Sequence, residues 1–181
     1  MMAIPVTDDE SLQRAIHDEV ALHAYNPQWP ALFEVGRSRL RSLFPQIAAI
    51  EHIGSRAVEG LDAKPIIDLM AGVAAMETAL LLAEPLCRSG YTTSSKFNAS
   101  LTDRQWFMRW ANGHRTHHLH VVLHEGAVWQ GRLKSRDALR GNAELAAQYL
   151  QLKQRVATEH AHDREAYTVA KTAFIQSLVA S

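Results

Sequence analysis

Three side chains have the types and spacing to bind a metal ion. Asp68 lies inside an apolar segment, and His118 and His120 alternate with apolar residues further along the chain. Alternate residues of a β-strand share one face, so the two imidazoles stand side by side and can share one divalent ion. An unpaired carboxylate in an apolar strand is costly, so Asp68 needs a cation, donors or solvent. The pattern equally allows a structural aspartate paired with Lys64 or an arginine, and a half-exposed histidine face.

A Gly-Ser pair is the main candidate for binding an anion. Gly54 and Ser55 follow an apolar segment, where glycine permits close backbone approach and the hydroxyl and N–H groups can hold an anion. An ordinary turn accounts for a bare Gly-Ser equally well. The chain contains neither GxxxxGK[ST] nor GxGxxG, so neither the phosphate loop of the Walker type nor a dinucleotide fingerprint is present.

Basic residues are frequent in the C-terminal third of the chain. A solvated helix face is the commoner arrangement for such residues. Four of them could nevertheless face a phosphate: Arg132, Lys134, Arg136 and Arg140. Two tyrosines are each followed four residues later by a lysine, which in a helix predicts the lysine packed over the aromatic ring: Tyr149 with Lys153, and Tyr167 with Lys171.

The composition indicates one soluble globular domain over residues 1–181. Apolar residues make up 47% and charged residues 21%, values typical of such domains. Nineteen basic residues balance nineteen acidic ones, which argues against general nucleic-acid binding. The single cysteine, Cys87, fits a reducing cytoplasm. Without a signal-peptide pattern or an apolar run of membrane-spanning length, we expect a cytoplasmic protein with no membrane partner.

The spacing of apolar residues predicts a small mixed sheet flanked by helices, an α/β or α+β fold. Strands are expected at residues 19–25, 47–53 and 66–73, the last of them central because it is apolar almost throughout. Asn112-Gly113 predicts a β-hairpin between residues 105–111 and 116–124. Residues 94–103 are expected to form a mobile loop. Helices are expected at residues 8–17, 29–44, 76–88 with Pro85 kinking or shortening the helix, 127–140, 143–159 and 164–179.

Several sequence blocks together resemble the GrpB-like proteins, an uncharacterised family. They are YNPQWPALF at residues 25–33, EHIGSRAVEGLDAKPIIDLMAGV at 51–73, THHLHVV at 116–122, SRDALRGNAELAAQYLQLK at 135–153 and, more weakly, REAYTVAKTAFI at 164–175. Their order and spacing agree with the family over nearly the whole chain, and the chain is identified as a member on these motifs.

The resemblance implies a fold similar to the polymerase-β-like nucleotidyltransferases, with a core followed by C-terminal helices. There a Gly-Ser pair handles a nucleoside triphosphate, and carboxylates on the next strand bind a divalent metal such as Mg²⁺, Mn²⁺ or Zn²⁺. The residues that would bind phosphate are Gly54, Ser55, Arg56, Lys64 and Arg136. Asp68 would be catalytic and would hold the metal together with His118 and His120.

The chain departs from that pattern at the proposed metal site. Met70 stands where the second carboxylate is usual, and one carboxylate with imidazoles suits Zn²⁺, Mn²⁺ or Ni²⁺ better than Mg²⁺. Near the Gly-Ser pair, Arg56 replaces a small hydroxyl residue and would reinforce anion binding, whereas Glu59 would oppose it.

Three functions follow as alternatives. The first is metal-dependent nucleotidyl or phosphoryl transfer to a hydroxyl of a small molecule or protein. The second is a non-catalytic module that binds a nucleotide, another phosphorylated small molecule or a coenzyme-A-related partner, since some GrpB-like domains are fused to dephospho-CoA kinase. The third is a structural or interaction protein whose pocket is vestigial. Fold resemblance alone does not choose among them.

Overall fold

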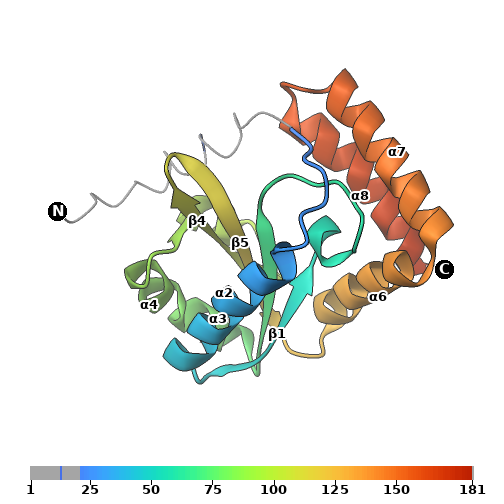
Figure 1. Ribbon diagram of the computed structural model, residues 1–181. Helices are drawn as coiled ribbons and strands as arrows, with labels where there is room; N and C mark the ends of the chain where they lie inside the picture. Colours follow the sequence, from blue (N-terminus) through green and yellow to red (C-terminus); the bar gives the residue numbers. More distant parts are fainter. Residues whose placement is uncertain (1–12, 14–20, 181) are drawn as a thin grey trace.

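A mixed five-stranded sheet lies at the centre of the computed structural model, which describes residues 13 and 21–180 (Figure 1). The strands run in the order β1-β2-β5-β4-β3. β2 pairs antiparallel with β1 on one side and parallel with β5 on the other, so it is an interior strand as expected. The strand bounds are β1 Ile47–Ile53, β2 Ile67–Val73, β3 Thr92–Thr93, β4 Arg104–Ala111 and β5 His114–Leu123.

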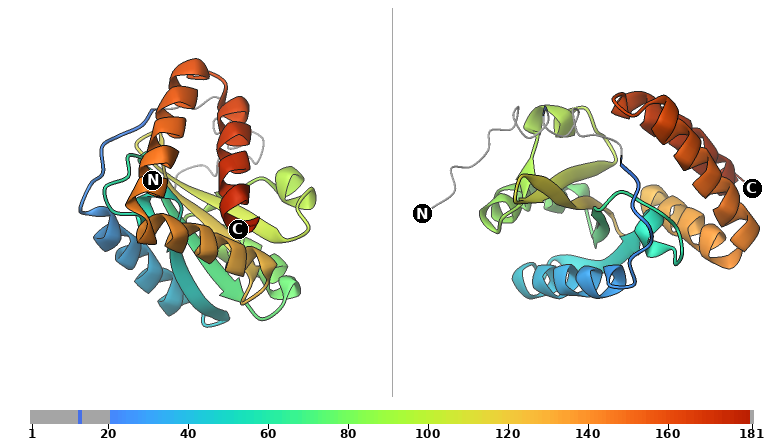
Figure 2. Two further views of the ribbon diagram at one scale, coloured as in Figure 1. Left: turned by 90° about the vertical axis from the view of Figure 1, so that its right-hand side faces the viewer. Right: turned by 45° about the horizontal axis from the view of Figure 1, so that its top comes forward.

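Helices cover both faces of this sheet. α2 and α3 pack on one face and α6 on the other, and α7 and α8 lie side by side next to α6 (Figures 1 and 2). The mixed sheet flanked by helices, with helices at the C-terminal end, confirms the expected fold class. The helix bounds are α2 Trp29–Leu43, the 3₁₀ turn η1 Ser55–Ala57, α3 Met76–Leu81, α4 Ala83–Arg88, α5 Ser95–Ala99, α6 Ala127–Gly141, α7 Ala143–Glu159 and α8 Arg164–Ala180.

Strand alternation divides β2 between two cores. Leu69 and Ala71 face α2 and α3, where they join the large apolar core of the molecule. Met70 faces the other way and packs with Ile53, Val122 and Trp129 beneath α6. Asp68 lies two residues before Met70 and therefore shares its face of the sheet. The fold thus places the carboxylate at the end of the strand, next to the smaller core.

Sequence spacing explains the first long helix. Pro30 occupies the first turn of α2, where a missing N–H costs little. The buried positions of the helix recur at helical intervals: Trp29, Phe33, Gly36 and Leu40. The hairpin of β4 and β5 also forms as expected, with Asn112 and Gly113 at positive φ in its turn. The three C-terminal helices match their predicted ranges to within one residue.

Three local expectations were wrong. Within the described part of residues 19–25 there is only one β-bridge, from His23 to Ala63, because nearby Pro65 has no N–H with which to extend a ladder. The single helix expected at residues 76–88 is two helices. The first ends at Leu81, four residues before Pro85, where the proline ring would clash with its carbonyl.

The expected mobile loop at residues 94–103 contains α5 and is firmly anchored. Ser94 caps the helix by accepting a hydrogen bond from Phe97 N. The buried Asn98 side chain bonds to the Thr93 hydroxyl and to both the N–H and the carbonyl of Trp106.

The helix expected at residues 8–17 lies outside the described residues apart from position 13. Within the described part of the chain, no helix has the length and apolarity needed to cross a membrane.

Candidate functional site

Asp68, His118 and His120 come together at one end of the two parallel strands. Asp68 on β2 is paired in register with His118 on β5, and His120 follows on the same face. The Asp68 Oδ1 atom lies 3.2 Å from His118 Nδ1 and 3.9 Å from His120 Nε2. The Asp68 side chain is 27% exposed and both imidazoles are 13% exposed, so the cluster is reached from solvent through the carboxylate.

The electrostatics of the cluster favour an anionic carboxylate between two neutral imidazoles. Burial, with a smaller contribution from the charge of Arg132, lowers the pKa of His120 to about 4. Burial also lowers the pKa of His118. Burial alone would raise the pKa of Asp68, but hydrogen bonds from both imidazoles outweigh it and hold that pKa well below its usual range. At neutral pH the cluster therefore carries one negative charge.

The hydrogen-bond partners of His118 determine where its proton lies. Arg115 Nη1 lies 3.0 Å from His118 Nε2, and a guanidinium can only donate. His118 Nε2 is therefore the acceptor, and Nδ1 carries the proton that it donates to Asp68. His120 differs, because its Nδ1 atom is buried without a hydrogen-bond partner in the described part of the chain.

Gly54 is fitted against Asp68. Its φ of +76° lies in the region that favours glycine, and a Cβ atom added to it would lie 2.8 Å from Asp68 Oδ2. The next residue, Ser55, lies beside the Tyr149 side chain of α7. Gly54 and the carboxylate, 14 positions apart in sequence, are thus closely packed.

The other proposed phosphate ligands have contacts of their own, although Lys64 lies close enough for its charge to lower the pKa of His118. Lys64 packs over the Tyr167 ring at 4.5 Å from its centroid. Arg56 stacks on Trp29 at 4.3 Å, and its side chain is almost entirely buried. Arg136 Nη1 donates to Glu51 at 2.7 Å and to the His52 carbonyl at 3.1 Å, while its Nε atom donates to an aspartate. The structure therefore brings Gly54 against Asp68 and Lys64 near His118, whereas Arg56 and Arg136 are held by other contacts.

The donor set fits some metals and not others. Asp68, His118 and His120 each offer a ligand atom within 4.8 Å of the others. A single carboxylate with two imidazoles suits Zn²⁺, Mn²⁺, Fe²⁺ or Ni²⁺. It does not form the oxygen cage that Mg²⁺ prefers, because the cluster holds a single carboxylate and Met70, two residues after Asp68 on the same face, is fully buried among apolar side chains. Arg115 opposes metal binding, since histidine ligands usually donate their second N–H to an acceptor.

Three further residues lie near the cluster; Arg115 and Trp106 were not singled out from the sequence, whereas Arg132 was named only as one of four basic residues that could face a phosphate. Arg115 contacts His118, the Trp106 ring stands edge-on to His118 at 5.5 Å, and the charge of Arg132 acts on His120. Arg132 follows the buried Trp129 by three residues, so helical periodicity would have placed it on the inward face of α6. Arg115 and Trp106 reach the cluster through strand pairing, which no local pattern reveals.

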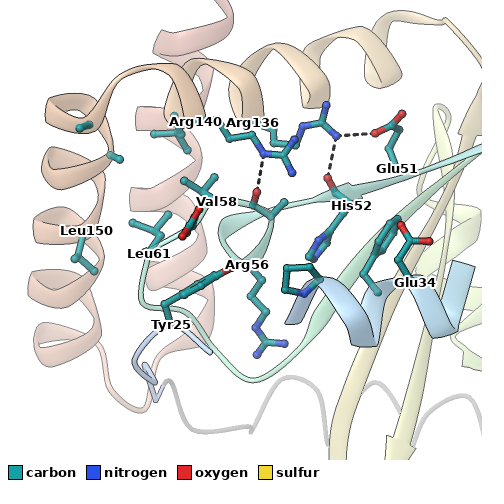
Figure 3. A pocket seen from close by; sticks show the side chains of 18 of the residues that line it. Tyr25, Glu34, Glu51, His52, Arg56, Val58, Leu61, Arg136, Arg140 and Leu150 are labelled. Carbon is teal, nitrogen blue, oxygen red and sulfur yellow. Dashed lines mark hydrogen bonds and ion pairs between the residues drawn. The ribbon is translucent and has the colours of Figure 1, made fainter. Parts of the chain in front are cut away.

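A cavity of about 870 Å³ lies at the free edge of β1, between α2, the η1 turn, α6 and α7 (Figure 3). His52 on β1 faces α2, where it stacks on Phe33 at 4.6 Å, whereas its neighbour Ile53 faces the smaller core with Met70. Arg136 and Arg140 border the cavity on the α6 side and bond to the β1 edge and the η1 turn, respectively. The cavity thus adjoins the η1 turn at the β1 edge of the sheet, and Asp68 is not among its lining residues.

The fold and the cluster define a mixed α/β domain with an Asp-His-His group at the end of two parallel strands. Comparison with known proteins identifies the family to which the chain belongs. The sequence profile described as GrpB protein matches residues 19–181, so the chain belongs to the GrpB family.

Individual members of the family are similar over most of this chain. UPF0157 protein YqkA of Bacillus subtilis is 32% identical over 160 residues, which are 88% of this chain and 46% of YqkA, so the chain spans about half of that relative. Glutamate-rich protein GrpB of Alkalihalophilus pseudofirmus is 30% identical over 89% of this chain and 94% of its own length. The crystal structure of conserved protein GrpB from Enterococcus faecalis superposes with a TM-score of 0.78 at 31% identity, covering 88% of this chain and 95% of that one.

Proposed function

We propose that this protein is a metal-dependent enzyme that transfers a nucleotidyl or phosphoryl group to a hydroxyl of a small molecule or protein. The observation that carries the proposal is the contact of the Gly54–Ser55 turn with Asp68, which in turn contacts His118 and His120. An anion-holding turn beside a carboxylate-imidazole cluster is the arrangement that phosphate-ester chemistry needs.

Each residue has a distinct role in this proposal. Asp68, His118 and His120 would hold one divalent ion, with Zn²⁺ or Mn²⁺ preferred over Mg²⁺. A divalent ion supplies charge neutralisation at phosphate oxygens and acidifies a bound hydroxyl. The backbone of Gly54 and the hydroxyl of Ser55 would orient a phosphate of the donor nucleotide. Tyr149, which lies beside Ser55, would limit the positions that the Ser55 side chain can take.

Metal binding is the first test. Calorimetric titration of the metal-free protein should give a Zn²⁺ or Mn²⁺ dissociation constant at least tenfold below that for Mg²⁺. Asp68→Asn and His120→Gln should each weaken binding at least tenfold. His114→Gln is the matched control, because His114 is an exposed residue on the same strand. Equal affinity in Asp68→Asn and the native protein would remove the metal site from the proposal.

Transfer is tested separately, with triphosphates labelled on the α- or γ-phosphate and broad acceptor mixtures in the presence of Mn²⁺ or Zn²⁺. Labelled product that depends on Asp68 supports the enzyme. Absence of transfer above the Asp68→Asn background, in protein that binds both metal and nucleotide, would refute catalysis.

A second candidate function is favoured by Met70. This residue is 0% exposed in an apolar cluster at the place where the nucleotidyltransferase resemblance requires a carboxylate. On this reading the protein binds a nucleotide or a coenzyme-A-related ligand without turnover. Thermal unfolding separates the two functions: stabilisation by ATP or coenzyme A in EDTA supports the binding module, whereas stabilisation by nucleotide only when metal is present supports the enzyme.

A further inference from the structure

The cavity at the free edge of β1 has the volume of a small-molecule site. Its 870 Å³ lies within the range of about 300–1,000 Å³ that is usual for such sites. It is formed by segments far apart in sequence, because α2, the η1 turn, α6 and α7 all contribute to its walls (Figure 3). It is open to solvent on one side, so a ligand can enter without unfolding the domain.

The walls of the cavity differ in chemistry. The side formed by α7 and the loop after η1 is apolar, and Figure 3 shows Leu150, Leu61 and Val58 together there. The opposite side is charged: Arg136 pairs with Glu51 at 2.7 Å, and Arg37 pairs with Glu34 at 3.1 Å. An amphipathic cavity of this kind suits a ligand with an apolar body and a polar head.

Two buried polar side chains that line the cavity lack hydrogen-bond partners in the described part of the chain. Arg56, which is 3% exposed, leaves its Nε and Nη2 atoms unpaired, and His52, which is 6% exposed, leaves its Nε2 atom unpaired. Nε and Nη2 form the edge of a guanidinium that binds two oxygens of a carboxylate or phosphate side by side. A buried guanidinium whose bidentate edge is empty is costly, and an anion would relieve that cost.

The charge balance of the lining also favours an anion. Four arginines and three glutamates line the cavity: Arg37, Arg56, Arg136, Arg140, Glu34, Glu51 and Glu59. Within the described ranges, Arg56 and Arg140 form no ion pair with a carboxylate, and Arg140 instead donates to the Ala57 carbonyl at 2.7 Å. Figure 3 shows the Arg56 side chain extending away from Arg136 and Arg140, toward the far end of the cavity.

We propose that this cavity is a second, metal-independent site that binds an organic anion, with its carboxylate or phosphate on the Nε–Nη2 edge of Arg56 and its apolar body against Leu61 and Leu150. Arg56 now stacks on Trp29, so binding requires the two side chains to part enough to admit the anion. Asp68 does not line the cavity, so the site can be tested whether or not the protein transfers phosphate.

Four probes separate the requirements of the site. Hexanoate and hexyl phosphate carry an apolar body with either head group, inorganic phosphate lacks the body, and 1-hexanol lacks the charge. Nitrogen-15 NMR titrations of the full chain in EDTA should show hexanoate or hexyl phosphate binding at least tenfold tighter than inorganic phosphate and 1-hexanol. The tighter of the two anions identifies the head group. The shifts should concentrate in η1 and the first half of α7.

Two pairs of variants locate the site. Arg56→Met removes the guanidinium and should weaken binding at least tenfold, whereas Arg155→Met, at an exposed position of α7 outside the cavity, should leave it unchanged. Ala147→Trp places an indole in the apolar wall and should block binding, whereas Gln148→Trp, one residue further on, should not. If Arg56→Met does not fold, the tryptophan pair decides.

The outcomes are distinct from those of the metal proposal. Binding in EDTA that survives Asp68→Asn supports the second site even if metal and transfer assays fail. The inference is overturned if neither hexyl probe binds tighter than inorganic phosphate or 1-hexanol. It is equally overturned if Ala147→Trp binds the probes as well as Gln148→Trp.

Discussion

Replacement of Gly54 by alanine tests the contact on which the proposed site depends. The residue has φ +76° and ψ −174°, a conformation that costs a residue with a side chain about 1–3 kcal/mol. The new Cβ would also lie 2.8 Å from Asp68 Oδ2 and 3.4 Å from its Cβ and Cγ atoms. Relieving this clash means turning a carboxylate that His118 holds at 3.2 Å, at a further cost of about 1.5–3 kcal/mol for a charged hydrogen bond. We expect a total loss of about 2.5–6 kcal/mol.

Gly60→Ala is the matched control. Gly60 has nearly the same φ, +79°, but a Cβ atom added there meets nothing within 4 Å. Its substitution should therefore cost only the backbone term, about 1–2 kcal/mol. Both free energies of unfolding are measured by equilibrium urea denaturation, and the difference between the two variants reports the contact with Asp68.

A double-mutant cycle identifies the partner. In the Asp68→Ala background the clash is gone, so Gly54→Ala should become at least about 1 kcal/mol less costly, while the cost of Gly60→Ala should not change. If Gly54→Ala and Gly60→Ala destabilise the protein equally, or if the cycle shows no coupling, then the turn does not press on the carboxylate and the proposed site loses its phosphate-holding half.

Three further predictions test other parts of the molecule. Burial, and to a smaller extent the nearby charge of Lys171, lowers the pKa of Lys153 to about 7, against 10.5 in the unfolded chain. As the pH rises, Lys153 therefore loses its proton in the native state before it does so in the unfolded state. Native stability should therefore rise relative to Lys153→Met by about 1.4 kcal/mol per pH unit between pH ~7 and pH ~10.5, measured by urea unfolding across pH; parallel curves would refute this. Asn98→Ala should cost about 1–3 kcal/mol of unfolding free energy, because it leaves the buried N–H of Trp106 unpaired; unchanged denaturation would contradict it. Arg115→Met should tighten Zn²⁺ binding in calorimetry, because His118 Nε2 is freed to carry the proton; equal or weaker binding would show that Arg115 does not oppose the metal.

The sequence was sufficient to predict elements whose signals are local. Helical spacing located α2 and the C-terminal helices, and the Asn112-Gly113 turn located the hairpin. Alternation correctly placed His118 and His120 on one face of their strand. The tyrosine-lysine spacing was also informative, since Lys153 and Lys171 do pack over the rings of Tyr149 and Tyr167.

Features that depend on pairing between distant segments were not predictable in this way. The register of β2 with β5 sets Asp68 opposite His118, yet it results from the packing of both strands and not from either sequence alone. The α5 segment has few apolar residues, and its order comes from hydrogen bonds of Asn98 to β4. The cavity beside β1 likewise exists only after α2, α6 and α7 have packed.

Residues 54–56, at the start of the η1 turn, connect these features, because they contact three different parts of the molecule. Gly54 packs against Asp68 of the cluster, Ser55 lies beside Tyr149 of α7, and Arg56 stacks on Trp29 and lines the cavity. An anion that moves Arg56 would therefore act on the same short segment that packs Gly54 against Asp68. Such coupling is reciprocal, so a ligand in the cavity and a ligand at Asp68 should each change the affinity of the other by the same factor.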